Sequence, residues 1–336
     1  MFFLRQQLAI DLGTSNIRIS MPQKGVLVDE PAVVAINRNT HQIMAIGEEA
    51  RNMLGKTPAD IIAAKPLKNG VIANYRITEG IIKYYIDKIL PSVRILGPEI
   101  MSSVPAGITS TERRAIIDAI KSVGTNSVYI IKAPLAAALG AGIAIAEPHG
   151  NMIIDIGGGT SEIAIISLGN IVSHSSIRVA GDTMDHAIID HIRKKYNLAI
   201  GEKTAERVKI EIGAISPQLD NKSIEISGNN TISELPEILT ITTEEVIQAL
   251  KNPVKEIINA VKYVLQNTPP ELASDVIDRG IILTGHAARL RGLDELLSRV
   301  TGVPVHMAEE PEYCVIKGCG IALENLDSYK RSAIRA

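Results

Sequence analysis

Residues 151–166, NMIIDIGGGTSEIAII, hold one acid and three consecutive glycines between two apolar runs. The runs 152–154 and 163–166 are rich in isoleucine and predict two buried strands. Glycines in the connecting turn permit positive φ and leave the backbone N–H groups open to a phosphate, because no Cβ stands in the way. The segment therefore predicts a phosphate-binding turn, with a plain tight hairpin as the alternative.

The same plan occurs at 7–19, QLAIDLGTSNIRI, where Asp11 takes the place of Asp155. A third glycine turn, in IILTGHAARL at 281–290, again follows an apolar strand. The repeat divides the chain into two related halves that face one another. Two such turns could hold a polyphosphate from opposite sides, and an Asp at the end of each strand suits a hydrated Mg²⁺. The repetition favours this interpretation over separate hairpins.

Length and charge limit the remaining possibilities. A chain of 336 residues is expected to form more than one domain. With 35 basic and 37 acidic residues, it offers no broad positive surface, so we expect no nucleic-acid partner. No apolar run reaches the length of a membrane span, and no secretory signal is present. We therefore expect a cytoplasmic protein, with Cys314 and Cys319 as reduced thiols.

Local patterns predict helices at 109–124, 204–212 and 243–266. The first has Thr109 or Ser110 as its N-cap and stops at Gly124. Residues 23–47 contain β-branched runs and a polar turn, which indicate a small sheet. Turn residues and short strand-like runs also alternate over 216–242. Each half thus carries an inserted subdomain near its surface.

Five segments together resemble the MreB family of bacterial actin homologues, in that family's order and over residues 7 to 325. They are AIDLGTSN, IIDIGGGTSEIAIISLG, IRVAGDTMDHAI, GEKTAERVKIEIG and TPPELASDVIDRGIILTG. The resemblance implies an α/β, actin-like fold of duplicated RNase H-like domains in four subdomains, with ATP and Mg²⁺ in the cleft between the domains. The expected subdomains are IA (1–34, 75–147 and 312–330), IB (35–74), IIA (148–182 and 244–311) and IIB (183–243).

The resemblance also assigns site residues. Asp11 and Asp155 would organise the metal through water and, with Thr160, form the catalytic set. The residues expected to contact the phosphates are Thr14, Ser15 and Asn16 from the first half, and Gly157, Gly158, Gly159 and Thr160 from the second. Those expected around the adenosine are Glu206, Lys209, Gly285, His286 and Ala287. Two alternatives stay open: Glu206 and Lys209 could form a helix-surface ion pair, and His286 could be an exposed loop residue.

Several positions depart from the family pattern, among them the third glycine turn, where TGHAARL brings in His286 and Ala287 in place of a run of glycines. Lys132 and Ala133 replace the two glutamates of the family's Glu-Glu-Pro, and the second glutamate helps to position the attacking water. Alanine cannot orient a water, and Glu162 is no substitute because the family carries a Glu there as well. Asn74 stands near the expected cleft where an Asp is usual. We therefore expect a weak ATPase at most.

The resemblance implies a cytoskeletal polymer that acts in cell shape or motility, with slow ATP hydrolysis. It would form double protofilaments of identical subunits, with paralogous subunits as further candidates, on the inner face of the cell membrane. The residues expected to contact lipid are Phe2, Phe3 and Leu4 at the N-terminus and Ile95 and Leu96 in a loop. The alternatives are an ATP-locked scaffold without turnover and a monomeric actin-fold ATPase.

Overall fold

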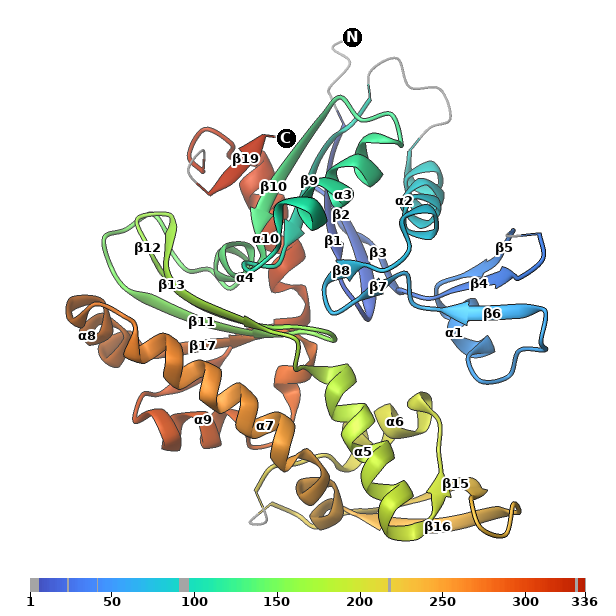
Figure 1. Ribbon diagram of the computed structural model, residues 1–336. Helices are drawn as coiled ribbons and strands as arrows, with labels where there is room; N and C mark the ends of the chain where they lie inside the picture. The colour runs from blue at the N-terminus through green and yellow to red at the C-terminus, as the bar shows by residue number, and fades with distance from the viewer. Residues whose placement is uncertain are drawn as a thin grey trace.

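The computed structural model describes residues 6–22, 24–40, 42–90, 97–216, 219–329 and 332–335. It consists of two halves, each built on one large sheet, which are stacked in the view of Figure 1. The residues predicted to contact lipid, Phe2, Phe3, Leu4, Ile95 and Leu96, lie outside the described residues, so that contact stays a prediction. In the described part of the chain, no helix is both long and apolar enough to cross a membrane.

The first half contains a six-stranded sheet in the order β19-β10-β9-β1-β2-β3. β1, β2 and β3 pair as an antiparallel meander, whereas β9 lies parallel to both β1 and β10. The strands are β1 (Gln7–Leu12), β2 (Asn16–Met21), β3 (Gly25–Pro31), β9 (Glu99–Val104), β10 (Ser127–Lys132) and β19 (Ala333–Arg335).

The second half repeats this topology in a five-stranded sheet of order β13-β12-β11-β17-β18. β11, β12 and β13 form the antiparallel meander, and β17 lies parallel to both β11 and β18. The strands are β11 (Asn151–Ile156), β12 (Ser161–Ser167), β13 (Asn170–Ile177), β17 (Ile281–Thr284) and β18 (Val305–Met307). The glycine hairpins read from the sequence are β1–β2 and β11–β12, so the predicted duplication is confirmed.

Each half also carries a small three-stranded sheet. The one in the first half contains β4 (Val34–Asn37), β5 (Ile43–Ile46) and β6 (Ile61–Ala64), with helix α1 (Glu48–Met53) beside it and the short pair β7 (Leu67–Lys68) and β8 (Val71–Ile72) after it. The one in the second contains β14 (Leu198–Ala199), β15 (Ser223–Asn230) and β16 (Pro236–Thr242). Assigning all of 23–47 to a small sheet was wrong for β3, which joins the large sheet by pairing with β2.

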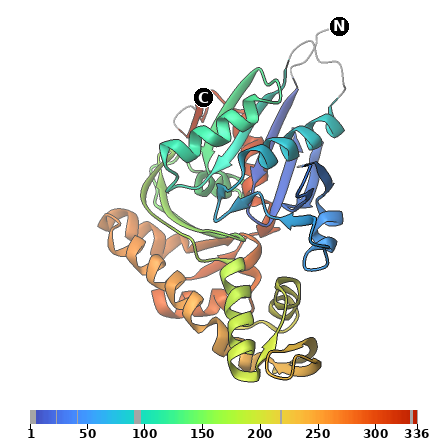
Figure 2. The ribbon, with the colours of Figure 1, turned by 45° about the vertical axis from the view of Figure 1, so that its right-hand side comes forward.

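Helices α2 (Tyr75–Ile89) and α3 (Ser110–Lys121) bury apolar faces against the first large sheet. The Thr109 side chain accepts from Glu112 N, and the Glu112 side chain accepts from Thr109 N, so a capping box begins α3 where the sequence predicted a helix start. Figure 2 shows both helices along the same side of the sheet.

Helices α4 (Ala133–Gly140) and α10 (Cys314–Glu324) connect the halves. Their buried residues form one core with residues of both large sheets, including Ala9 and Met101 from the first and Ile153 from the second. The two helix backbones come very close, because a Cβ on Gly318 would stand 1.8 Å from Ala136 O. This closely packed helix pair joins the two large sheets at one end of the space between the halves.

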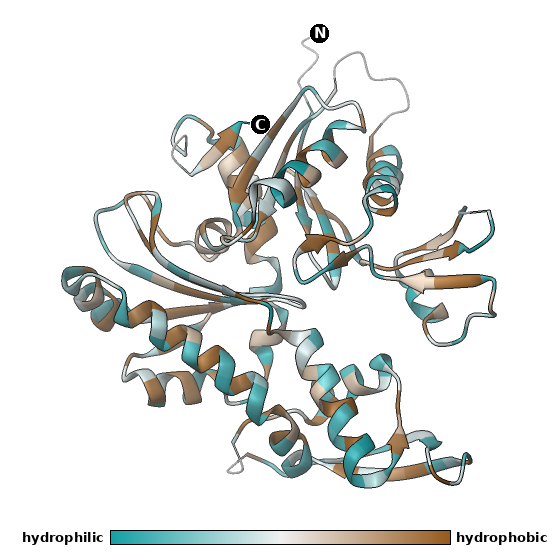
Figure 3. Ribbon diagram, viewed as in Figure 1, coloured by the Kyte–Doolittle hydropathy of each residue, from teal (hydrophilic) through white to brown (hydrophobic). Residues whose placement is uncertain are grey.

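The second large sheet is covered by long amphipathic helices. α7 runs from Thr243 to Gln266, the span that the sequence predicted, and α6 begins two residues before the predicted start at 204. Figure 3 shows hydrophobic residues on the central strands and hydrophilic ones along the outer side of α5 and α7. The helices are α5 (Gly181–Tyr196), α6 (Glu202–Ile212), α7 (Thr243–Gln266), α8 (Pro270–Arg279) and α9 (Leu293–Thr301), with 3₁₀ turns η1 (His286–Arg289) and η2 (Pro311–Tyr313).

Candidate nucleotide site

A cleft of about 430 Å³ lies between the halves, where the glycine turns that follow β1, β11 and β17 meet. Parallel strands of one sheet end at the same edge, so the two related sheets present their carboxyl ends to a common space. The structure places every residue predicted to contact the nucleotide or the metal in its lining: Asp11, Thr14, Ser15, Asn16, Asp155, Gly157, Gly158, Gly159, Thr160, Glu206, Lys209, Gly285, His286 and Ala287. Their roles toward a nucleotide stay predictions.

The two phosphate turns face each other directly. A Cβ on Gly158 would lie 1.9 Å from Ser15 Oγ, and one on Gly159 would lie 2.4 Å from Thr14 Oγ1. Only glycine therefore fits at these positions in the observed arrangement. The second turn is fastened to the start of α5, because Asp182 N donates to Gly158 O at 2.7 Å. The result is a pair of closely apposed, partly buried turns that line the cleft, and glycine turns of this kind bind phosphate through their backbone N–H groups.

Asp11 and Asp155 form an acidic pair in the cleft, in which Asp155 is buried and Asp11 is partly buried. Burial raises the pKa of Asp155 to about 7, and the negative charge of Asp11 adds to that rise, although Thr284 Oγ1 donates to Asp155 at 2.9 Å. Burial likewise raises the pKa of Asp11, against the opposing effects of Arg18 and of Ser103 Oγ, which donates at 2.8 Å. Two carboxylates that are costly to ionise side by side fit a divalent cation, which would compensate both charges.

Glu162 on β12 is held in place by two donors. Its side chain is almost completely buried and accepts from Ala106 N at 2.9 Å and from Ser176 Oγ at 2.6 Å. Burial raises the pKa of Glu162. Because one carboxylate oxygen binds the loop after β9 and the other binds β13, Glu162 ties the first half to the second. Both oxygens are engaged, which agrees with the expectation that Glu162 does not replace the missing glutamate.

The altered catalytic position is in the cleft. Ala133, the first residue of α4, contributes only a methyl group to the lining. Lys132 is exposed and is not among the described residues that line the cleft. Partial burial, and then the charge of Lys132, lower the pKa of His174 on β13, so Lys132 lies toward that strand. Neither residue brings a carboxylate to the phosphate end.

At the adenosine end, Glu206 and Lys209 each have a separate partner. Glu206 Oε2 accepts from Arg51 Nη2 at 2.6 Å, whereas Lys209 Nζ lies 2.8 Å from Asp185 Oδ1 and donates to Gly181 O at 3.0 Å. The alternative of a simple ion pair between Glu206 and Lys209 is therefore wrong.

His286 combines two of the predicted features. It is exposed, as the alternative had it, and it also lines the cleft from the first position of η1.

Asn74 lies at the start of α2 and not in the lining of the cleft, near which it was expected. Its side chain caps α2 by accepting from Ile77 N at 3.3 Å, and it is not among the described residues of the cleft lining. The change from Asp to Asn therefore acts on a helix start.

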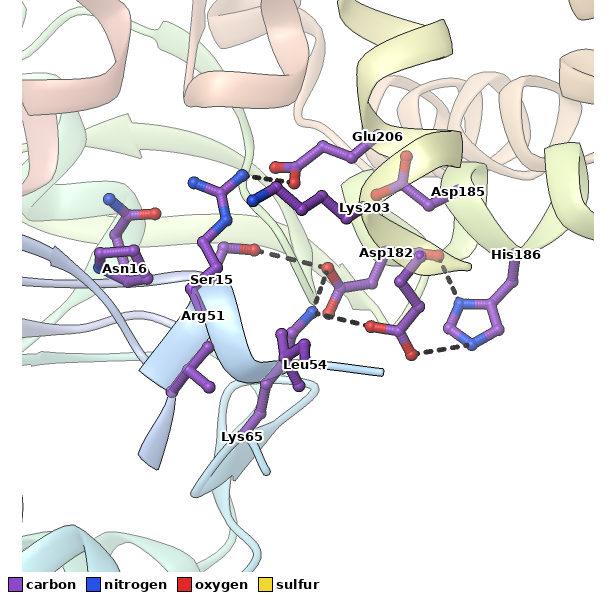
Figure 4. Close-up of a pocket in the computed structure, with 13 residues that line it drawn as sticks. Ser15, Asn16, Arg51, Leu54, Lys65, Asp182, Asp185, His186, Lys203 and Glu206 are labelled. Carbon is purple, nitrogen blue, oxygen red and sulfur yellow. Dashed lines mark hydrogen bonds and ion pairs between the residues drawn. The ribbon is translucent and has the colours of Figure 1, made fainter. Parts of the chain in front are cut away.

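Side chains of the two small subdomains meet across the outer end of the cleft (Figure 4). Besides the pair of Arg51 and Glu206, Lys65 Nζ lies 3.1 Å from Asp182 Oδ1, and Ser15 Oγ donates to the same oxygen at 3.4 Å. No local sequence pattern indicates these partners, because they stand more than 100 residues apart. Arg18 was not predicted either, although a local signal for it exists: a charged residue inside the apolar strand NIRISM.

Comparisons with known proteins agree with this architecture. Residues 5–331 match the family model described as MreB/Mbl protein. The cell shape-determining protein Mbl of Bacillus cereus is 46% identical over 330 residues, covering 98% of this chain and 99% of that protein. The cell shape-determining protein MreB of Escherichia coli is 43% identical over 327 residues, covering 96% and 94%.

Solved structures share the fold. MreB 5 of Spiroplasma citri bound to AMPPNP superimposes with a TM-score of 0.93 and 37% identity, covering 97% of this chain and 98% of that one. The MamK double helical filament gives a TM-score of 0.80 at 20% identity, covering 96% and 99%, which supports the fold alone. The predicted actin-like fold is confirmed, and the chain belongs to the MreB/Mbl family.

Proposed function

We propose that this chain binds ATP and Mg²⁺ in the cleft and polymerises in response, as a cytoskeletal protein of cell shape or motility. One observation carries the proposal: the glycine turns of two duplicated hairpins face each other in a cleft that also contains Asp11 and Asp155. A solved relative of the same family, MreB 5 of Spiroplasma citri, is bound to AMPPNP. That relative supports a nucleotide as the ligand of this chain.

Residues at different places in the cleft would contact different parts of the nucleotide. Backbone N–H groups of the turns at 13–16 and 157–160 would bind the phosphates from opposite halves, so that one ligand draws both halves together. Bound Mg²⁺ would offset the negative charge of the phosphates, held through water by Asp11 and Asp155. Glu206 and Lys209 would flank the adenosine from α6.

Hydrolysis is slow in this proposal, because Ala133 cannot orient the attacking water. A positioned base or water-orienting group typically contributes about 10² to 10⁴ in rate. Thr160 and the glycine turns still surround the transferring phosphoryl group, so turnover persists at a low level. Binding depends on groups that are all present, and ATP therefore drives assembly before it is split.

Assembly would produce double protofilaments of identical subunits, with paralogous subunits as further partners. The inner face of the cell membrane is the proposed location, through Phe2, Phe3 and Leu4 together with Ile95 and Leu96. Family membership supports the role in cell shape, since relatives that cover nearly all of this chain are cell shape-determining proteins.

Pelleting and phosphate release, measured on the same samples with and without ATP, test the proposal. We expect ATP-dependent pelleting that precedes a slow release of phosphate. Pelleting without any release would instead establish an ATP-locked scaffold. Release without pelleting at any protein concentration would establish a monomeric ATPase and overturn polymerisation.

A further inference from the structure

Arg18 brings a guanidinium into the cleft that none of the roles above uses. It stands on β2, where Ile17 and Ile19 turn into the core of the first half and Asn16 and Arg18 turn the other way. Only 11% of its side chain is exposed, although it lines the cleft. A buried positive charge in an apolar strand is costly unless a negative group compensates it.

Two aspartates flank Arg18 in the sheet. In the strand register, Asp11 of β1 stands opposite it on one side and Asp29 of β3 on the other. Arg18 Nη1 is 3.9 Å from Asp11 Oδ2, and Arg18 Nε is 3.1 Å from Asp29 Oδ1. Tyr313 braces the outer side, with its ring centroid 5.3 Å from the guanidinium and its hydroxyl donating to Asp29 Oδ2 at 3.0 Å. The side chain is therefore held in place before any ligand arrives.

These contacts do not satisfy the guanidinium. It carries five N–H donors. Within the described part of the chain, no residue accepts a well-aligned hydrogen bond from it, and Nε is buried with its hydrogen bond unmade. Arg18 thus has ion-pair neighbours and a fixed position but unused donors in a cleft. A fixed cationic side chain with unpaired donors in a cleft is typical of a residue that binds an anionic ligand.

We propose that Arg18 is a phosphate-binding residue, whose guanidinium donates to the oxygens of the polyphosphate beside Asp11. The inference rests on the proposed nucleotide site and adds a contact to it. Arginine suits this task because its planar donors match phosphate oxygens in pairs. Arg18 would then also offset the negative charge of Asp11 when no cation is bound. The ligand class is a nucleoside di- or triphosphate, because the proposed site puts the β- and γ-phosphates, and not the α-phosphate, beside Asp11.

A purely structural role makes a different prediction. If Arg18 only joins β1, β3 and η2, its loss deforms the cleft for every ligand, whether or not the ligand carries a polyphosphate. If Arg18 binds phosphate, its loss weakens the binding of ATP and ADP but leaves the binding of AMP nearly unchanged. The comparison among ATP, ADP and AMP therefore separates the two roles.

The test measures dissociation constants for ATP, ADP and AMP in the parent chain, Arg18→Leu and Arg18→Lys. Arg114→Leu is the matched control, because Arg114 is an exposed arginine on α3 outside the cleft lining. Each measurement is made with Mg²⁺ and with EDTA, and thermal unfolding without nucleotide reports on the fold of each variant.

We expect Arg18→Leu to weaken ATP and ADP about 10- to 100-fold while AMP changes by less than about threefold, in both Mg²⁺ and EDTA. Arg18→Lys should recover part of the loss, because the charge remains. If Arg18→Leu does not fold, Arg18→Lys decides, since the loss of paired donors still weakens ATP more than AMP. Unchanged ATP affinity, an equal loss for AMP, or a loss that requires Mg²⁺ would each overturn the inference. A parent chain that binds none of the three nucleotides would instead refute the proposed function.

Discussion

Asp155 shows at the residue scale how burial sets the chemistry of the cleft. It lies at the end of β11, where 8% of the residue is exposed and Asp11 is close enough to raise its pKa further. Sequence alone suggested an acid beside a glycine turn. The structure adds that burial makes this acid difficult to ionise, so a bound cation would favour its charged form.

The raised pKa of Asp155 predicts a pH dependence in the protein without nucleotide. The folded state binds this proton more tightly than the unfolded chain, where the pKa is near 3.8. The free energy of unfolding contributed by Asp155 therefore falls as pH rises from about 4 to about 7, and it stays low above that range. Asp155→Asn removes this fall. Urea unfolding from pH 4.5 to 8 measures it, and parallel curves for parent and variant would contradict the assignment.

Substitutions at Ala133 test the proposed slow hydrolysis of ATP. Ala133→Glu restores a carboxylate at a position that lines the cleft, and phosphate release should rise by at least about tenfold. Lys132 could pair with the new carboxylate and hold it off the water, so Lys132→Glu with Ala133→Glu is the stronger variant. Lys132→Ala is the control and should leave release unchanged, since Lys132 lies toward His174. A brisk parent rate that Lys132→Ala abolishes would mean that Lys132 itself contacts the phosphate.

At the element scale, the pair of α4 and α10 sets the distance between the halves. Gly318 permits that pair, because its hydrogen points where a Cβ would meet Ala136 O at 1.8 Å. Gly320, two residues on in the same helix, has its nearest such neighbour, Ser20 Oγ, at 3.8 Å. One helix therefore contains a glycine that packing requires and a glycine that it does not.

The two glycines predict opposite effects on stability. Gly318→Ala should destabilise the fold by about 1 to 3 kcal/mol, because the helices must separate. Gly320→Ala should be neutral or should stabilise by up to about 1 kcal/mol, because alanine favours the helix. Chemical denaturation of both variants checks the difference. Equal free energies of unfolding would show that α4 and α10 are not packed as described.

How far the elements follow from sequence depends on whether their signals are local. The capping boxes at Thr109 and Thr242, and the glycines after Asp11 and Asp155, are encoded within a few residues, and the elements that they begin or join were predicted. The membership of β3 in the large sheet depends on pairing with β2, and the partner of Glu206 depends on α1 of the other half. Such contacts are fixed by packing between distant segments, and no nearby residue signals them.

On the scale of the whole molecule, the cleft is closed at one end by α4 and α10 and bridged at the other by side chains. In the part of the chain that the structure describes, Arg51 and Glu206 form the shortest ion pair of that bridge, and each side chain is one-third exposed. A partly exposed pair contributes modestly to stability. Because the pair lies across the outer end of the cleft, we expect it to affect the rate of nucleotide release and not the stability of the fold.

Arg51→Ala should therefore speed nucleotide dissociation several-fold while leaving the melting temperature nearly unchanged. Glu206→Ala is not a clean partner variant, since Glu206 is also expected to contact the adenosine. Arg114→Ala, on the exposed face of α3, is the control. Stopped-flow chase of a fluorescent ATP analogue gives the rates. Equal dissociation from the parent and Arg51→Ala would show that the bridge does not retain the nucleotide.

We propose that nucleotide binding, without hydrolysis, closes the two halves into a subunit that assembles. Pelleting of the chain with Mg²⁺ and AMPPNP, compared with Mg²⁺ alone, tests it most directly, with Asp155→Ala as the variant that should fail to respond. We expect a large pelleted fraction with AMPPNP, little without nucleotide, and little for Asp155→Ala in either condition. The same pelleted fraction with and without AMPPNP, or assembly that occurs only as ATP is hydrolysed, would contradict it.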